Sequence, residues 1–183
     1  MKLILSFAFV IYIQLSFGQQ IPNSFLGLKL GTTKEVFLQN NPDAEPGEFW
    51  VVKTEISADG MDVYTITKKT SGGDQVQIDC CFKNNKLSII SVEYKGFQFE
   101  NEILSGLKSK YGNYSNRFVK NYTDFMNGQG RTTYITTWSK NPAYILEYDH
   151  TKEIGLAELI FAEKSAQNAL KKLKENENKK KVE

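Results

Sequence analysis

The sequence predicts an α+β fold, in which an antiparallel sheet has helices packed on one face. Short runs of alternating apolar and polar residues, separated by turn residues, predict strands. The links between them are too short for parallel crossovers, so the strands form antiparallel meanders. Helical segments interrupt the strands in an order that suggests two helix-plus-meander halves, although no sequence identity between the halves is visible.

The first predicted helix covers residues 33–40. Thr32 stands three residues before Glu35, which is the spacing of a capping box. Val36 and Phe37 are expected to face inward. A short strand is predicted just before this helix from the alternation of Leu26, Leu28 and Leu30.

A first meander of four strands follows. Its strands are predicted at residues 50–56, 63–68, 75–82 and 87–94, with turns at 58–60, 71–74 and 83–86. The third of these strands has the clearest alternation. It places Cys80 on an inner face with Val76, Ile78 and Phe82, and Cys81 on an outer face.

A second helix and a second meander are predicted next. The helix covers residues 100–111, carries Ile103, Leu104, Leu107 and Tyr111 on one side, and is followed by Gly112 as a C-terminal cap. Strands are predicted at residues 115–124, 131–139, 144–149 and 156–161. A third helix, residues 163–175, has a narrow apolar stripe that includes Ala166, Ala169, Leu170 and Leu173.

The first 18 residues have the layout of a secretory signal peptide. Lys2 provides the positive start, an apolar run of about 13 residues follows, and Ser16 and Gly18 are small residues before a cut at Gln19. The run is shorter than the ~20 residues that span a bilayer, and no later segment is apolar enough to do so. We therefore expect residues 1–18 to be a signal peptide, 19–178 a single α+β domain and 179–183 a disordered basic tail. The protein is expected to be exported, to a periplasmic or extracellular space.

Composition excludes several classes of protein. The 165 residues that remain after removal of the signal peptide carry a net charge of +1. A charge so close to zero does not provide the positive electrostatic field that is expected of a nucleic-acid-binding protein. Two Cys and one His are too few for a zinc framework or a multi-disulfide scaffold. No phosphate-binding loop or calcium loop is present, so the sequence predicts no metal and no cofactor.

The two cysteines and the histidine are the chemically reactive candidates. Cys80 and Cys81 leave three interpretations open: a vicinal disulfide, a Cys81 bond to another chain, or two reduced thiols buried beneath helices. His150 is expected at the end of a strand as an exposed turn residue. Beside Asp149, or near Cys81, it is the only candidate for a general base, and no catalytic motif accompanies it.

Aromatic residues are dense between positions 111 and 148. One sheet face can bury only about half of such a set, so the remainder is a candidate recognition surface for a glycan, peptide or protein. The alternative is a thick aromatic core with scattered surface Tyr. The candidate binding residues are Tyr134, Trp138, Tyr144 and Tyr148.

The segment Phe25-Leu-Gly-Leu-Lys-Leu-Gly-Thr-Thr-Lys-Glu-Val36 resembles the opening of small exported bacterial α+β domains. The group includes the small lipoprotein of the outer-membrane barrel-assembly machinery and the β-lactamase-inhibitor-protein-like domains. The chain lacks that group's lipidated N-terminal Cys and its Gly-x-Pro after the first helix. The resemblance implies a non-enzymatic periplasmic binding or scaffolding domain.

The expected function is therefore an exported, soluble, non-catalytic binding or scaffolding protein of the bacterial envelope. The alternative is a small periplasmic enzyme or a hydrolase inhibitor. The sequence names no particular protein, peptide or glycan partner.

Overall fold

The computed structural model describes residues 23–47, 61–69, 75–95, 100–123, 129–151 and 155–169. Several expectations lie outside these ranges and stay predictions. They are the signal peptide, the strand at residues 50–56, the turns at 58–60 and 71–74, the stripe residues Leu170 and Leu173, and the basic tail at 179–183.

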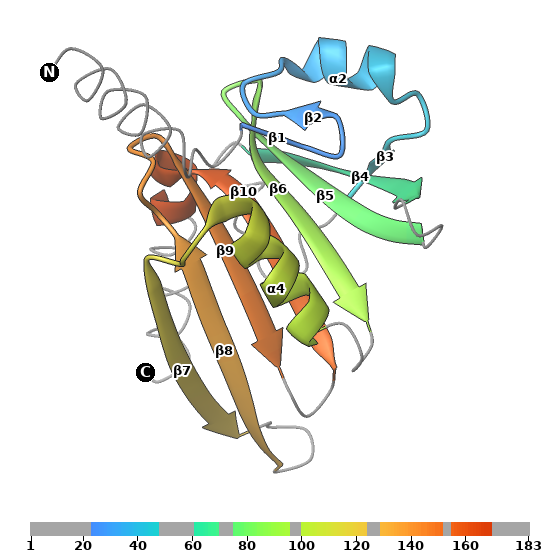
Figure 1. Cartoon of the computed structure of the whole chain (residues 1–183). Helices are drawn as coiled ribbons and strands as arrows, with labels where there is room; N and C mark the ends of the chain where they lie inside the picture. Colours follow the sequence, from blue (N-terminus) through green and yellow to red (C-terminus); the bar gives the residue numbers. More distant parts are fainter. Residues whose placement is uncertain are drawn as a thin grey trace, which may run out of the picture.

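One antiparallel sheet of eight strands dominates the described chain, as the sequence predicts for an α+β fold (Figure 1). Its order is β3-β4-β5-β6-β10-β9-β8-β7. The strands are β3 (Glu45–Pro46), β4 (Met61–Lys69), β5 (Gln75–Lys83), β6 (Lys86–Lys95), β7 (Asn116–Thr123), β8 (Gly130–Trp138), β9 (Tyr144–Thr151) and β10 (Leu156–Glu163).

Two meanders meet at the middle of this sheet. Helix α2 (Lys34–Asn40) precedes the run β4-β5-β6, and helix α4 (Glu100–Tyr111) precedes the run β7-β8-β9-β10. The last strand of each meander pairs with that of the other, since β6 and β10 are antiparallel neighbours with Val92 opposite Leu159. The order of elements therefore has the helix-plus-meander repetition that the sequence suggests.

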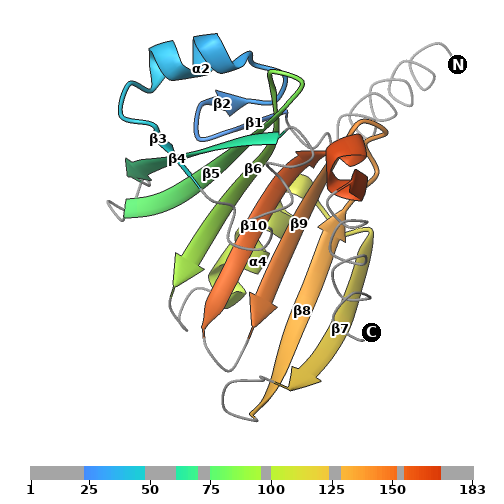
Figure 2. The same ribbon diagram turned by 180° about the vertical axis from the view of Figure 1, so that it is seen from behind.

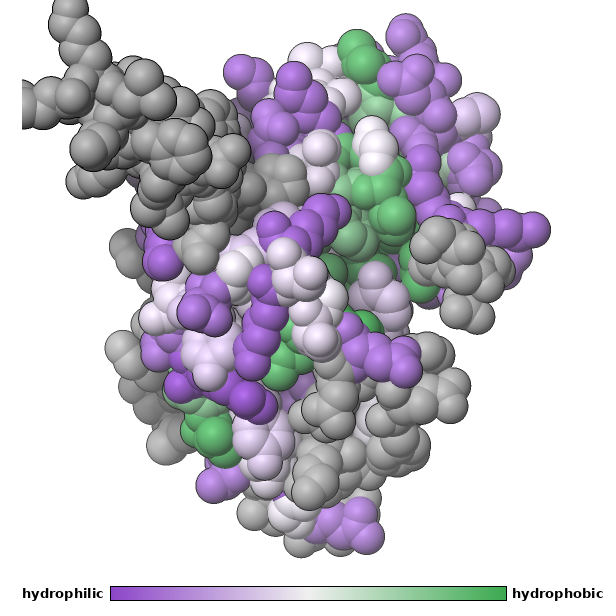
Figure 3. Space-filling model, viewed as in Figure 1, coloured by the Kyte–Doolittle hydropathy of each residue, from purple (hydrophilic) through white to green (hydrophobic). Residues whose placement is uncertain are grey.

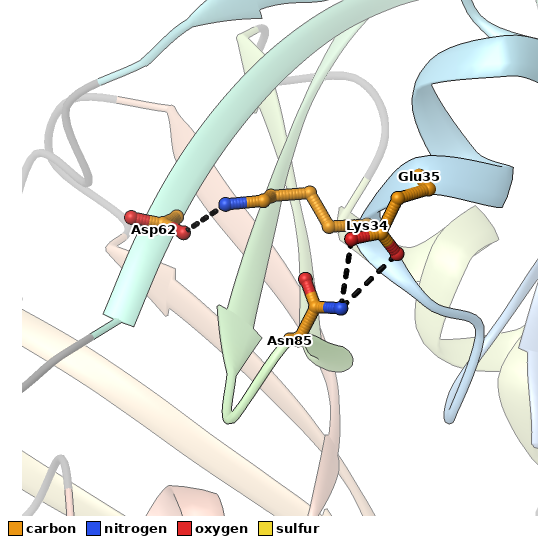
Figure 4. A network of polar contacts seen from close by, with 4 residues as sticks. All are labelled: Lys34, Glu35, Asp62 and Asn85. Carbon is orange, nitrogen blue, oxygen red and sulfur yellow. Dashed lines mark hydrogen bonds and ion pairs between the residues drawn. The ribbon is translucent and has the colours of Figure 1, made fainter.

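Helix α2 is held over the sheet by polar contacts as well as by Phe37, which is buried. Lys34 Nζ lies 2.7 Å from a carboxylate oxygen of Asp62 on β4. Asn85 Nδ2 donates to both carboxylate oxygens of Glu35 at 2.9 and 3.0 Å (Figure 4). Asn85 lies in the β5-β6 turn, so these contacts join the helix to β4 and to that turn. The hydrogen bond from Asn85 lowers the pKa of Glu35.

The N-terminal cap of α2 differs by one residue from the expected capping box. Thr33, not Thr32, is the cap, and its hydroxyl accepts from Val36 N at 3.5 Å. Val36 is 46% exposed, so its expected inward position is wrong, whereas the expectation for Phe37 is confirmed.

Helix α4 has the predicted bounds and packs on one face of the sheet, which we call the α4 face (Figure 1). Leu104, Leu107 and Tyr111 are buried in a cluster with residues of β5, β6, β9 and β10. Gly112 has φ +73° and its N–H donates to Lys108 O at 2.8 Å, which closes the helix as a C-terminal cap.

The other face of the sheet, which we call the opposite face, is covered in part by a helical segment at residues 164–169. Ala166 is fully buried there in a cluster with Ile89, Ile145 and Ile160. Seen from behind, this segment lies on the side of the sheet away from α4 (Figure 2). This segment and α4 lie on different faces, so the expected packing of the helices on one face is not confirmed.

Candidate functional site

The two edges of the sheet are very different. The β3 edge is only two residues long, and its second residue, Pro46, has no N–H to offer a partner strand. The β7 edge is eight residues long and contains no Pro. Its pairing with β8 runs without a shift from Asn116 to Thr123. Within the described part of the chain, no strand lies beyond β7 (Figures 1 and 2).

Strand β7 also carries the largest exposed apolar side chains of the sheet. Phe118 is 44% exposed and Val119 is 53% exposed, and residues 116–121 are all in the exposed class. Adjacent strand residues point to opposite faces, so β7 presents one apolar side chain on each face. Figure 3 shows a small hydrophobic area among hydrophilic atoms on the side where β7 runs.

Phe118 and Val119 each stand at the outer end of a row of paired residues that runs across the neighbouring strands. On the α4 face, Val119 stands opposite Tyr134, which stands opposite His150. On the opposite face, Phe118 stands opposite Ile135 of β8. A strand added outside β7 would extend both rows and cover the exposed ends.

The charged side chains of strand β7 are all positive. Strand β7 contains Arg117 and Lys120 and no acidic residue. Arg117 lies on the α4 face with its guanidinium carbon 5.2 Å from the centre of the Tyr134 ring. Lys120 lies on the opposite face, because it is three residues along the strand from Arg117. Within residues 117–120, each face of the edge therefore has one apolar side chain and one cation.

Of the four aromatic candidates, only Tyr134 lies beside this edge. Trp138 and Tyr148 are 3% and 2% exposed and are core residues, so they cannot contact a ligand on the surface. The indole N–H of Trp138 donates to Gly112 O at 2.9 Å, which attaches β8 to the end of α4. Tyr144 packs partly buried against the same core.

His150 is buried, at 3% exposure, so the expected exposed turn residue is wrong. Strand β9 continues to Thr151, and the imidazole lies within the strand. Its ring is nearly parallel to those of Tyr134 and Tyr148, with both centre-to-centre distances 6.5 Å. The neighbouring Asp149 points to the opposite face, so strand geometry separates it from the imidazole.

Cys80 and Cys81 are both free thiols and both fully buried. The expectation that Cys81 is a surface thiol is wrong, because an apolar cluster that includes Ile89 and Ala166 covers the opposite face at this position. Burial raises the pKa of Cys80 to about 12, and it raises the pKa of Cys81 well above its ordinary value. Neither thiol is a nucleophile at neutral pH.

A Cys–His pair is also excluded by position. Cys81 on β5 and His150 on β9 are separated by β6 and β10. Three strand spacings amount to about 14 Å. Cys81 belongs to the cluster on the opposite face, and the ring of His150 is on the α4 face.

The opposite face carries an array of carboxylates that the local sequence pattern does not indicate. Glu93, Glu158 and Asp149 stand directly opposite one another on three neighbouring strands. Nearby side chains donate hydrogen bonds to some of these carboxylates, since Ser91 donates to Glu158 at 2.6 Å. Glu147, two residues before Asp149 on the same face of β9, accepts from Gln167 at 3.0 Å. Among the described residues, no group of three or more His, Cys, Asp or Glu is arranged to hold a metal ion. Tracing one face across several strands would have found the array, but that requires the strand order.

No protein-family description, curated protein or solved structure matches this chain. Among the residues that the structure describes, no helix has the length and apolar character needed to cross a membrane.

The sequence signal for the β7 edge is the pair Phe118-Val119 with a cation on each side. Two adjacent apolar residues in a strand require that both faces be covered or that one side chain remain exposed. The sequence cannot show that β7 is the outermost strand. That position follows from the pairing of β6 with β10, which puts the first strand of the second meander at the rim.

Proposed function

We propose that this protein is an exported, non-catalytic binding domain that captures an extended protein segment as an additional strand on β7. The observation that carries the proposal is the edge of β7, which pairs with no further strand among the described residues, is long and regular, and has apolar side chains exposed on both faces. Strand addition is a recurrent mode of peptide recognition, in which backbone hydrogen bonds give affinity and alternate side chains give specificity.

The backbone of β7 provides the bonding groups. In an antiparallel pair, the N–H and C=O of alternate residues point toward the partner, and those of the remaining residues point away. About four of the eight residues of β7 therefore direct both groups away from β8. Each hydrogen bond is worth only about 0.5–1.5 kcal/mol net, so several are needed for useful affinity.

The side chains of β7 also support the proposal. A long apolar edge strand is normally a liability for aggregation, and charged residues on the edge reduce it. Arg117 and Lys120 have that protective effect while leaving Phe118 and Val119 accessible. This combination favours a reversible partner over non-specific association. The resemblance of residues 25–36 to exported binding domains supports the same class of function.

The enzyme alternative has no support in the geometry of the described residues. The two thiols have raised pKa values, and the imidazole is buried beside the rings of Tyr134 and Tyr148. A hydrolase inhibitor would be one instance of a protein-binding function, and the same edge would then contact the hydrolase.

The test is to select binders from a display library of random eight-residue peptides on the folded protein. Hydrogen exchange then maps where a selected peptide protects the backbone. The proposal predicts slower exchange at residues 116–123. Protection at α2, around the exposed Val36, with none at β7, would contradict it.

Two proline variants test the role of the β7 backbone. Since adjacent residues alternate, one of Phe118 and Val119 directs its N–H outward and the other directs it toward β8. Proline at the outward position should leave thermal stability near that of the parent protein and abolish peptide binding. Proline at the inward position should lower stability. The matched control is Val36→Lys, which changes a side chain of similar exposure on α2 and should leave binding unchanged.

A further inference from the structure

Given strand addition at β7, the residue pattern of this edge also defines the order of side chains in its partner. The edge reads Arg117, Phe118, Val119, Lys120 in sequence, with cations at both ends and apolar side chains between them. Residues that stand opposite each other in paired strands share a face. Each position of the partner is therefore matched to one position of β7.

We infer that the β7 edge binds an extended segment with the order acidic, apolar, apolar, acidic. One carboxylate would stand opposite Arg117 on the α4 face, and the other would stand opposite Lys120 on the opposite face. The two apolar side chains between them would cover Phe118 and Val119. Because the pattern reads the same in both directions, it holds for a parallel or an antiparallel partner.

The side-chain rows of the sheet support this order. The row that ends at Val119 continues inward through the half-buried ring of Tyr134, so an apolar partner residue would extend an existing apolar row. The row that ends at Phe118 continues through Ile135, which is also partly buried. A charged partner residue at either position would lose water against apolar side chains without gaining an opposite charge.

Charge decides against a second copy of the chain as the occupant. Two β7 strands pairing across a dimer would bring two cations from each copy into one short interface, with no acidic residue in either strand. Like charges close together on paired strands are destabilising. A segment that carries two carboxylates gains at the same positions.

The experiment compares capped eight-residue peptides with the same composition. The first has Glu-Val-Val-Glu at its centre and Thr elsewhere, and the second has Val-Glu-Glu-Val. Binding is followed by amide chemical-shift changes of the folded protein in low salt. The first peptide should bind about tenfold more tightly, as expected when several cross-strand pairs act together, with shifts at residues 116–123. Raising the salt concentration should reduce this difference.

A charge exchange completes the test. The double variant Arg117→Glu/Lys120→Glu should lose this preference and should bind a Lys-Val-Val-Lys peptide instead. Both side chains are exposed, so the variant should fold, which thermal unfolding verifies. Equal binding of the two Glu peptides at β7 would overturn the inferred order and leave strand addition standing. Absence of shifts at β7 with every peptide would contradict strand addition itself, and dimerisation through β7 in light scattering would identify a second copy as the occupant.

Discussion

The burial of Cys81 makes a prediction opposite to that of simple strand alternation. Cys81 is fully buried in an apolar cluster with Ile89, Ile145 and Ala166. The Cys81→Ser variant places a hydroxyl in this cluster, and a buried hydroxyl without a hydrogen-bond partner costs about 1–3 kcal/mol. For a chain of this length, 1 kcal/mol lowers Tm by about 2–4 °C, so the expected decrease is about 2–12 °C.

The assay combines thermal unfolding with thiol labelling of the folded protein. Only a thiolate reacts, and at pH 8 a pKa of about 12 leaves about 10⁻⁴ of Cys80 ionised, before steric protection is counted. Both thiols should therefore label slowly until the protein unfolds. Cys81→Ala is the matched control, since it adds no polar group and should cost less than the Ser variant.

Rapid labelling of Cys81 together with an unchanged Tm of Cys81→Ser would refute the reasoning. That outcome would mean that the opposite face of the sheet is open at β5. The helical segment at residues 164–169 would then not be packed as described.

The remaining predictions concern three other residues. Gln167→Ala removes a buried donor to Glu147 and should destabilise the protein by about 1–3 kcal/mol in denaturant unfolding; no change in midpoint would argue against the packing of residues 164–169. Burial raises the pKa of Asp79, so its charged form costs stability that is absent below the pKa of the unfolded chain and grows as pH rises through the folded pKa. Asp79→Asn should therefore raise Tm at pH 7 more than at pH 3, and equal effects at both pH values would contradict this. Trp138→Phe keeps an aromatic ring but loses the hydrogen bond to Gly112 O, so it should lower the free energy of unfolding by about 0.5–1.5 kcal/mol. Thermal unfolding measures this, and an unchanged stability would show that the hydrogen bond does not stabilise the fold.

Short stretches of the sequence are sufficient to predict much of the fold. Acidic residues at the start of α4, lysines at its end and Gly112 after it predict the helix with the bounds that it has. The turn between β5 and β6 has Asn84 and Asn85 at φ +50° and +63°, a backbone conformation that Asn tolerates well. Such features depend on neighbouring residues only, so the sequence contains them in full.

Features that depend on distant residues were predicted less well. Alternation shows that Cys80 and Cys81 face opposite ways, but it does not show whether the second face is covered. His150 was expected in a turn because the sequence after it resembles one, yet the pairing of β9 with β10 and β8 extends the strand past it. For the same reason, the exposed edge at Phe118 and Val119 could be recognised only once the order of strands was known.

The central claim is that β7 accepts an additional strand, and amide hydrogen exchange of the folded protein tests it most directly. The measurement compares exchange at residues 116–123 with and without a saturating amount of the peptide centred on Glu-Val-Val-Glu. Strand addition predicts that alternate amides of β7, whose N–H groups point outward, exchange several-fold more slowly in the complex. Binding of the peptide with unchanged exchange along the whole of β7 would contradict it.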